Sequence, residues 1–195
     1  NLLSIKNMVE KIGYNCEISD NVNTIEKADK LILSGVGHFS KAMRFLEEKK
    51  IIATLNHKVL DMKTPVLGIC LGMHLMTENS QEGEDVKGLS WVKANTIKFQ
   101  SNNKRFKIPH MGWSDANFSN ASKIRLLYDE QPRFYFTHSY KVICQDKKDV
   151  LAESHYITDF HSAFKKENIW GVQFHPEKSH KFGMKFLNYF INYNH

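Results

Sequence analysis

The sequence predicts an α/β fold, namely an open, mostly parallel sheet flanked by helices with an antiparallel, strand-rich extension. In the first half, helical and strand-like runs alternate, which is typical of a parallel sheet covered by helices. Residues 91–174 instead carry short apolar runs separated by polar turns, which favours antiparallel or mixed pairing. With 195 residues, of which 42% are hydrophobic, the chain is long enough for one core, so we predict a single domain over residues 1–195.

The first half begins with a helix, because Ile5, Val9 and Ile12 recur at helical spacing before Gly13 ends the run. The expected elements that follow are a strand at 16–18, a strand at 30–33, a helix at 41–48, a helix at 51–62, a strand entered at 64–66 and a helix-compatible run at 73–78. This alternation predicts that the carboxyl ends of the strands carry the active site.

The second half contains strand-like runs at 96–99, 134–136, 150–152 and 169–174. A final helix places aromatic residues on one face, namely Phe182, Phe186, Tyr189, Phe190 and Tyr193. Such a stripe indicates packing against the core rather than a cofactor site.

The composition excludes several classes of protein. The formal net charge is +6, but the lysines are scattered and not interleaved with aromatic residues, so we predict no nucleic-acid partner. We find no apolar run long enough to span a membrane and no signal peptide, so we expect no membrane association. The three cysteines do not form a disulfide framework, and a reducing cytoplasm is the expected location.

A reactive side chain stands between two glycines in the run Gly68-Ile69-Cys70-Leu71-Gly72, where a strand is predicted to meet a helix. This is the pattern of a nucleophile elbow with cysteine in place of serine. Side chains at positions 68 and 72 would crowd the backbone of such a tight turn. A lone buried cysteine is more often inert packing, so the assignment depends on a base elsewhere in the chain.

The apolar run at 169–174 leads into His175-Pro176-Glu177, which supplies such a base. Imidazole accepts and returns a proton near neutral pH, and a carboxylate on its second nitrogen holds its orientation. The alternative is a capped strand end with a surface glutamate. The order Cys70, His175, Glu177 favours a catalytic triad over this alternative.

These two motifs together resemble the class I (triad) glutamine amidotransferases. Further stretches are similar to the glutaminase subunit of imidazole glycerol phosphate synthase, namely Ser34-Gly35-Val36-Gly37-His38-Phe39, Pro109-His110-Met111-Gly112-Trp113, Phe136-Thr137-His138-Ser139-Tyr140 and His175-Pro176-Glu177-Lys178-Ser179. The resemblance runs along the whole chain in collinear order. Three positions depart from the family pattern: Ser34 replaces proline, His74 replaces glutamine and Ser114 replaces asparagine.

The resemblance implies a role for each matching residue. Cys70 would attack the side-chain amide of glutamine, with His175 as acid and base and Glu177 as its partner. The expected oxyanion donors are Leu71 and the loop of Gly35 and Val36, and the expected glutamine-binding residues are Gly37, His74, Ser139 and Tyr140. His110 and His138 are expected to be structural or interface residues, and we predict neither a metal nor a cofactor, since no paired-ligand motif is present.

The resemblance also implies a partner, because a free glutaminase would waste glutamine. Ammonia would pass to a separate (β/α)8-barrel subunit that makes imidazole glycerol phosphate and AICAR in histidine biosynthesis. Trp113, Tyr135 and Lys178 match positions expected at that interface, although core packing of Trp113 is an alternative. Because the family opens with a strand before the first helix, we expect about ten further residues to precede Asn1.

Two alternatives remain open. The segment 177–184 also resembles paralogues that supply ammonia for the amidination of a bacterial surface sugar, where only the ammonia acceptor differs. A non-catalytic scaffold subunit with the same fold predicts the loss of a triad residue, whereas Cys70, His175 and Glu177 are all present. A peptide hydrolase on this fold would leave the segments around Trp113 and Tyr140 unexplained.

Overall fold

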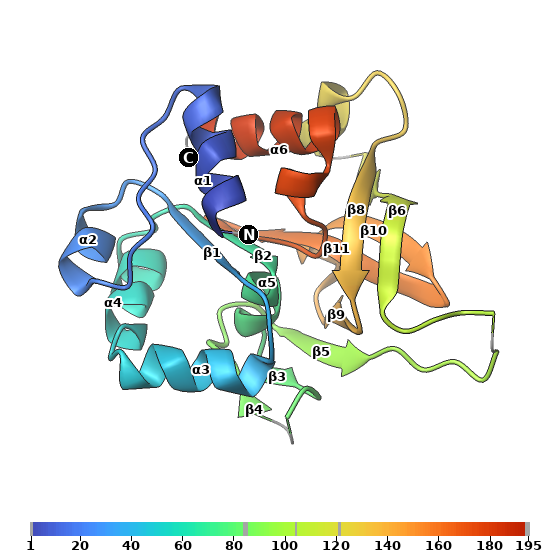
Figure 1. Cartoon of the computed structure of the whole chain (residues 1–195), viewed down its shortest axis with the longest axis horizontal. Coiled ribbons are helices and arrows are strands. Elements are labelled where there is room, and N and C mark those ends of the chain that lie inside the picture. The colour runs from blue at the N-terminus through green and yellow to red at the C-terminus, as the bar shows by residue number, and fades with distance from the viewer. Residues whose placement is uncertain (1, 84–85, 104, 121, 194–195) are drawn as a thin grey trace.

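The computed structural model describes residues 2–83, 86–103, 105–120 and 122–193, so Asn1 lies outside the described residues (Figure 1). Its largest sheet has the strand order β1-β2-β12-β11-β10-β7. These strands are β1 (Leu31–Gly35), β2 (Val66–Cys70), β7 (Asn117–Phe118), β10 (Val150–Tyr156), β11 (Thr158–Lys166) and β12 (Ile169–Val172). Strands β1, β2 and β12 are parallel, and the remaining pairings are antiparallel. The predicted α/β class, with parallel strands and an antiparallel extension, is confirmed.

Two smaller sheets complete the strand-rich half. One has the order β4-β3-β5-β9, and the other pairs β6 with β8. Their bounds are β3 (Asn79–Ser80), β4 (Val86–Lys87), β5 (Ala94–Lys98), β6 (His110–Asp115), β8 (Arg133–His138) and β9 (Tyr140–Cys144). Strands β6 and β8 stand beside the central sheet near the start of the last helix (Figure 1).

Helices cover both faces of the parallel strands. The helix α1 (Leu2–Ile12) lies beside α6 (His180–Asn192), whereas α3 (Phe39–Glu48), α4 (Ile52–Asn56) and α5 (Leu71–Leu75) lie on the opposite side (Figure 1). The remaining helical segments are α2 (Val22–Lys27), the π-helix η1 (His57–Asp61) and the 3-10 turns η2 (Lys123–Leu127), η3 (Lys147–Asp149) and η4 (Pro176–Lys178). None of the helices in the described ranges has the length and apolar character needed to cross a membrane.

The core has two halves, one against each face of the sheet. Leu67 and Ile69 of β2 pack in the cluster that contains Phe186 and Phe190 of α6. Val66 belongs to the second cluster, together with the apolar residues of α3, α4 and α5. All five residues of β2 are therefore buried, as expected for a parallel strand covered on both faces. This double burial gives Cys70, at the end of β2, a rigid support.

One expected element is wrong, because residues 16–18 form no strand. A strand is defined by pairing with a neighbour, and the described residues offer none to this segment. Instead, the carbonyl of Cys16 accepts a hydrogen bond from Lys6 Nζ at 2.6 Å. The predicted helix at 51–62 is present as α4 followed by η1, and the predicted aromatic face of α6 is confirmed as core.

Candidate active site

Cys70 occupies a strained turn between β2 and α5. Its φ is 53° and its ψ is −108°, a left-handed conformation that residues with a Cβ rarely adopt. A Cβ at Gly72 would lie 1.7 Å from the carbonyl oxygen of Leu33, and one at Gly68 would lie 2.7 Å from the backbone of Gly72. The predicted need for glycine at both positions is therefore confirmed. The close approach of α5 to β1 and β2 leaves no space for a side chain there.

Three groups surround the Cys70 sulfur, and the residue is 9% exposed. The carbonyl oxygen of Thr137 lies 4.0 Å from Sγ, and the Gln173 side-chain amide nitrogen lies 3.8 Å from it. The third is the imidazole of His175, which interacts electrostatically with Cys70. The fold thus brings the sulfur and the imidazole together across 105 residues of sequence.

His175 and Glu177 form a buried pair. His175 Nδ1 lies 2.7 Å from Glu177 Oε1, and their side chains are 2% and 0% exposed. Because an ionised carboxylate only accepts, Nδ1 carries the hydrogen and Nε2 is left for Cys70. Burial alone lowers the pKa of His175, but its hydrogen bonds and charge interactions with Cys70 and Glu177 raise this pKa to about 9. The imidazole therefore holds its proton at neutral pH.

The backbone around His175 is tied to the neighbouring strand β8. The N–H of His175 donates to the carbonyl of Tyr135 at 2.9 Å. The buried hydroxyl of Ser179 donates to the carbonyl of His175 at 2.6 Å and accepts from the N–H of Tyr135 at 3.0 Å. The position of the imidazole is therefore set by β8 as well as by β12.

The glycine loop lies directly beside Cys70. Gly35 at the end of β1 is the register partner of Cys70 at the end of β2. Val36 follows and is 71% exposed, and Gly37 has a φ of 125°, which favours glycine. Leu71, whose N–H comes immediately after Cys70, is buried. The structure thus gathers Leu71, Gly35 and Val36 around one end of β2.

Residues 2–192 match the family model described as glutamine amidotransferase class-I. The chain belongs to the class-I glutamine amidotransferases. It is 54% identical over 191 residues to the "imidazole glycerol phosphate synthase subunit HisH 2" of Methanococcus maripaludis, covering 98% of this chain and 94% of that protein. The "imidazole glycerol phosphate synthase subunit HisH 1" of Campylobacter jejuni strain RM1221 is 41% identical, with the same coverage.

Solved structures share the fold of this glutamine amidotransferase. A crystal structure described only as a glutamine amidotransferase matches with a TM-score of 0.75 at 14% identity, covering 98% of this chain and 92% of that one. The glutaminase domain of a Trypanosoma brucei protein, titled "CTPS" and solved with bound acivicin, matches with a TM-score of 0.63 at 14% identity, covering 99% and 89%. At these identities the likeness supports the fold alone.

The expected glutamine-binding residues lie in different surroundings. Ser139 and Tyr140 are half-buried and follow Thr137, whose carbonyl faces Cys70. His74 is 4% exposed, and its Nε2 lies 2.7 Å from Gln173 Oε1. Burial lowers the pKa of His74 to about 4, although the hydrogen bond to Gln173 opposes this change. His74 is therefore neutral in this glutamine amidotransferase near pH 7.

Sequence reasoning did not identify Gln173 and Thr137, both of which contact the Cys70 sulfur. Gln173 could have been identified from the sequence, because it is a polar residue within the apolar run at 169–174. A fully buried amide needs partners, so its position indicates a specific polar contact. Thr137 contributes only its carbonyl, and its side chain gives no such signal.

His110 and His138 form a buried hydrogen-bonded pair. His110 Nδ1 lies 3.0 Å from His138 Nε2, and His138 Nδ1 lies 2.7 Å from the carbonyl of Tyr140. His110 Nε2 lies 2.9 Å from the hydroxyl of Ser114. Burial lowers the pKa of both imidazoles, that of His110 to about 4. Within the described ranges, no three His, Cys, Asp or Glu side chains are grouped closely enough to hold a metal.

The three predicted interface residues lie together next to the site. Trp113 and Tyr135 are register partners on β6 and β8, with ring centroids 6.3 Å apart. The ammonium of Lys178 lies 5.4 Å from the centre of the Tyr135 ring. Trp113 is 38% exposed and stacks on His180 at 5.5 Å. Trp113 is thus a surface residue supported by neighbouring rings, not a core residue.

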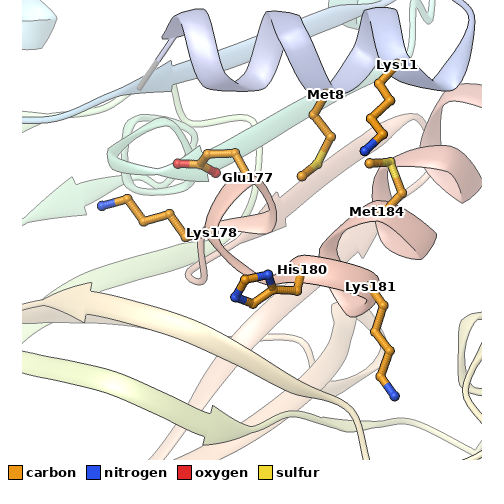
Figure 2. A pocket seen from close by; sticks show the side chains of 7 residues that line it. All are labelled: Met8, Lys11, Glu177, Lys178, His180, Lys181 and Met184. Atoms are coloured by element: carbon orange, nitrogen blue, oxygen red, sulfur yellow. The ribbon is translucent and has the colours of Figure 1, made fainter.

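A hollow of about 500 Å³ lies on the other side of Glu177, against α1 and the start of α6 (Figure 2). Its lining residues are Met8, Lys11, Glu177, Lys178, His180, Lys181 and Met184. Figure 2 shows Met8 and Lys11 reaching into this space from α1, opposite the residues of η4 and α6. Three lysines therefore border the hollow behind the carboxylate.

Proposed function

We propose that this glutamine amidotransferase is the glutaminase subunit of an imidazole glycerol phosphate synthase, which hydrolyses glutamine and supplies ammonia to a synthase subunit. The observation that carries the glutaminase activity is the placement of Cys70 beside His175, which is itself hydrogen-bonded to Glu177. The names of the relatives from Methanococcus maripaludis and Campylobacter jejuni support the synthase.

In the first half-reaction, the Cys70 thiolate attacks the side-chain carbonyl carbon of glutamine. Imidazolium at His175 gives its proton to the amide nitrogen as the carbon–nitrogen bond breaks, so ammonia leaves and a γ-glutamyl thioester remains. Glu177 stabilises the imidazolium and keeps its ring in position.

In the second half-reaction, neutral His175 takes a proton from water as the water oxygen attacks the thioester. The carbon–sulfur bond breaks, glutamate leaves, and the thiolate and imidazolium are restored. Because His175 alternates between acid and base, one side chain serves both steps.

Both steps place negative charge on the glutamine carbonyl oxygen, and this oxygen needs fixed donors. We assign the N–H of Leu71 and the loop of Gly35 and Val36 to this task, since Gly35 is the register partner of Cys70. One such donor lowers the barrier by about 3 kcal/mol. We assign Gly37, Ser139 and Tyr140 to the surroundings of the bound glutamine. The resemblance also implies a glutamine contact for His74, but the Nε2 of this buried imidazole is committed to Gln173.

The ammonia acceptor is a separate subunit, for which a (β/α)8 barrel is the proposed fold. The surface formed by Trp113, Tyr135 and Lys178 supports the docking site, because accessible aromatic rings beside a cation are typical of interface hot spots, and Trp113 is exposed while Tyr135 is half-buried. The hydrogen bond from the His175 N–H to the Tyr135 carbonyl supports a docking site close to the point at which ammonia would be released.

The test is glutamate release from glutamine, measured with and without a synthase subunit and an imidazole nucleotide. Cys70→Ala is expected to abolish glutamine-dependent synthesis while ammonia-dependent synthesis by the partner persists. Cys16→Ala is the matched control, because this cysteine is half-buried and has no role in the proposed mechanism. Equal loss of both activities in Cys70→Ala would contradict the proposed division of roles.

A second acceptor is supported by the resemblance of segment 177–184 to the surface-sugar paralogues. Two departures from the family pattern also weaken the first assignment: His74, which is buried and bonds to Gln173, and Ser114, which is half-buried and bonds to His110. The same glutaminase chemistry would then supply ammonia for amidination of a bacterial surface sugar. Complementation of a histidine auxotroph separates the two candidates. Growth supports the histidine pathway, and failure by a soluble, glutaminase-active chain supports the other acceptor.

A further inference from the structure

Two buried polar side chains connect helix α5 to the nucleophile. His74 Nε2 lies 2.7 Å from Gln173 Oε1, and Gln173 Nε2 lies 3.8 Å from Cys70 Sγ. Gln173 is 0% exposed and His74 is 4% exposed. The contacts therefore form a short series from His74 through Gln173 to the sulfur, separate from the pair formed by His175 and Glu177.

The direction of the hydrogen bonds in this series follows from the chemistry of the groups. An amide oxygen only accepts, so His74 Nε2 must donate to it. His74 is neutral near pH 7, since burial lowers its pKa to about 4, and its single N–H is therefore committed to Gln173. With its oxygen held by His74, the Gln173 amide presents an N–H to Cys70 and cannot turn its oxygen toward the sulfur.

This orientation matters because the two ends of an amide act oppositely on a thiolate. An N–H directed at Sγ stabilises the negative sulfur, whereas a carbonyl oxygen at the same position would repel it. The alternative explanation is that His74 and Gln173 simply satisfy each other as buried polar groups. That alternative requires no contact with Cys70 and predicts no effect on its reactivity.

We propose that His74 and Gln173 are positioning residues, in which the imidazole holds the amide so that its N–H faces the Cys70 sulfur and supports the thiolate. This proposal rests on the proposed glutaminase function and deepens it. It also gives His74 a different task from the glutamine contact implied by the family resemblance.

The titratable groups around the sulfur come from three elements. His175 and Glu177 follow β12, His138 ends β8, and His74 belongs to α5. His138 interacts electrostatically with both His74 and His175. Any pH profile of Cys70 reactivity therefore includes these groups, and the comparison must be made between variants that leave His175, Glu177 and His138 unchanged.

The test is the rate at which iodoacetamide alkylates Cys70 in the full chain, followed by mass spectrometry of its peptide from pH 5 to pH 10. Gln173→Met removes the amide while filling its volume. We expect the rate at pH 7 to fall about tenfold and the midpoint of the profile to move up by about one pH unit. An unchanged midpoint would overturn the proposal.

Two substitutions of His74, at the far end of the series from Cys70, provide a second test. This test does not require the Gln173→Met variant to fold. His74→Phe removes the donor, so the alkylation profile should shift in the same direction as in Gln173→Met. His74→Gln provides an N–H that can reach Gln173 Oε1, so it should return the profile toward that of the parent chain. Equal profiles for the two substitutions would contradict the proposed series.

Steady-state kinetics distinguish positioning from substrate contact. We expect His74→Phe to lower kcat for glutamine hydrolysis while KM for glutamine stays within about twofold. A raised KM with an unchanged alkylation profile would mean that His74 contacts glutamine, which would overturn the proposal. Alkylation is measured without glutamine, so it tests this proposal independently of glutaminase activity. If the proposed glutaminase function were wrong, the parent chain would have a reactive Cys70 but would release no glutamate.

Discussion

His175 Nδ1 lies 2.7 Å from Glu177 Oε1, and both side chains are almost completely buried although only Pro176 separates the two residues in the sequence. The η4 turn (Pro176–Lys178) folds the chain back so that the carboxylate reaches the ring beside it. Because the pair is removed from water, its charges interact strongly. Together with the interaction with Cys70, this contact raises the pKa of His175 to about 9.

Glu177→Gln should alter the pH dependence of glutamine hydrolysis. In the parent chain, kcat/KM is expected to fall as pH rises through about 9, where His175 loses its proton. Removing the carboxylate charge lowers the pKa of His175, so this alkaline limb should move to lower pH, and kcat should fall at least about a hundredfold. Glu130→Gln, on the surface, is the matched control. An alkaline limb that stays in place would contradict the assigned role.

Gly72→Ala should severely destabilise the fold. The new Cβ would lie 1.7 Å from the Leu33 carbonyl oxygen, so β1 and α5 would have to separate. We expect a loss of at least about 3 kcal/mol in the free energy of unfolding, measured by urea denaturation. Gly35→Ala is the control for stability, since its Cβ would meet only Leu71 Cδ2 at 3.6 Å. Similar unfolding midpoints for the two variants would contradict the prediction, because they would show that β1 and α5 can separate at position 72 with little loss of stability.

Buried neutral histidines should make the protein sensitive to mild acid. The folded-state pKa of His74 is about 4, whereas an unfolded histidine titrates near 6.5. The unfolded chain therefore binds more protons between these values, and stability should fall as pH drops from about 6.5 to 4, by up to about 3 kcal/mol for His74 alone. His110, with its pKa also lowered to about 4, should act in the same direction.

This acid sensitivity is measured by thermal unfolding at pH 7 and pH 5. His74→Gln should flatten the dependence of the melting temperature on pH, because glutamine does not titrate. His155→Gln, at an exposed position, is the matched surface substitution. A chain with His74→Gln that loses as much stability as the parent between these two pH values would contradict the prediction.

Trp113→Ala and Lys178→Ala should weaken binding of the synthase subunit. Trp113 presents a large, partly exposed ring, and Lys178 lies over the ring of Tyr135. Loss of a central aromatic residue typically costs about 2 kcal/mol, so Kd should rise about thirtyfold for Trp113→Ala and less for Lys178→Ala. Titration calorimetry provides the measurement. Leu126→Ala, at a residue that is 80% exposed, is the control and should leave Kd unchanged.

Most helices and strands could be predicted, because apolar periodicity and glycine positions act locally. The elbow at Cys70 could be predicted from the glycines at 68 and 72. Both positions need glycine because a Cβ there would collide with neighbouring backbone atoms. The strand expected at 16–18 failed because strand pairing is not a local property. Gln173 was missed for the same reason, since its importance depends on a sulfur more than a hundred residues away.

The amino-acid sequence alone determined the chemistry that is available: a thiol at a strand-to-helix turn, an imidazole with a carboxylate two residues later, and a glycine loop after an apolar strand. These features are encoded by neighbours along the chain. Only the tertiary structure decided that β2 and β12 lie side by side, so that Cys70 meets His175 and Gln173, and that His74 faces Gln173. Distances between remote residues are set by the packing of the sheet and its helices, which a local pattern does not contain.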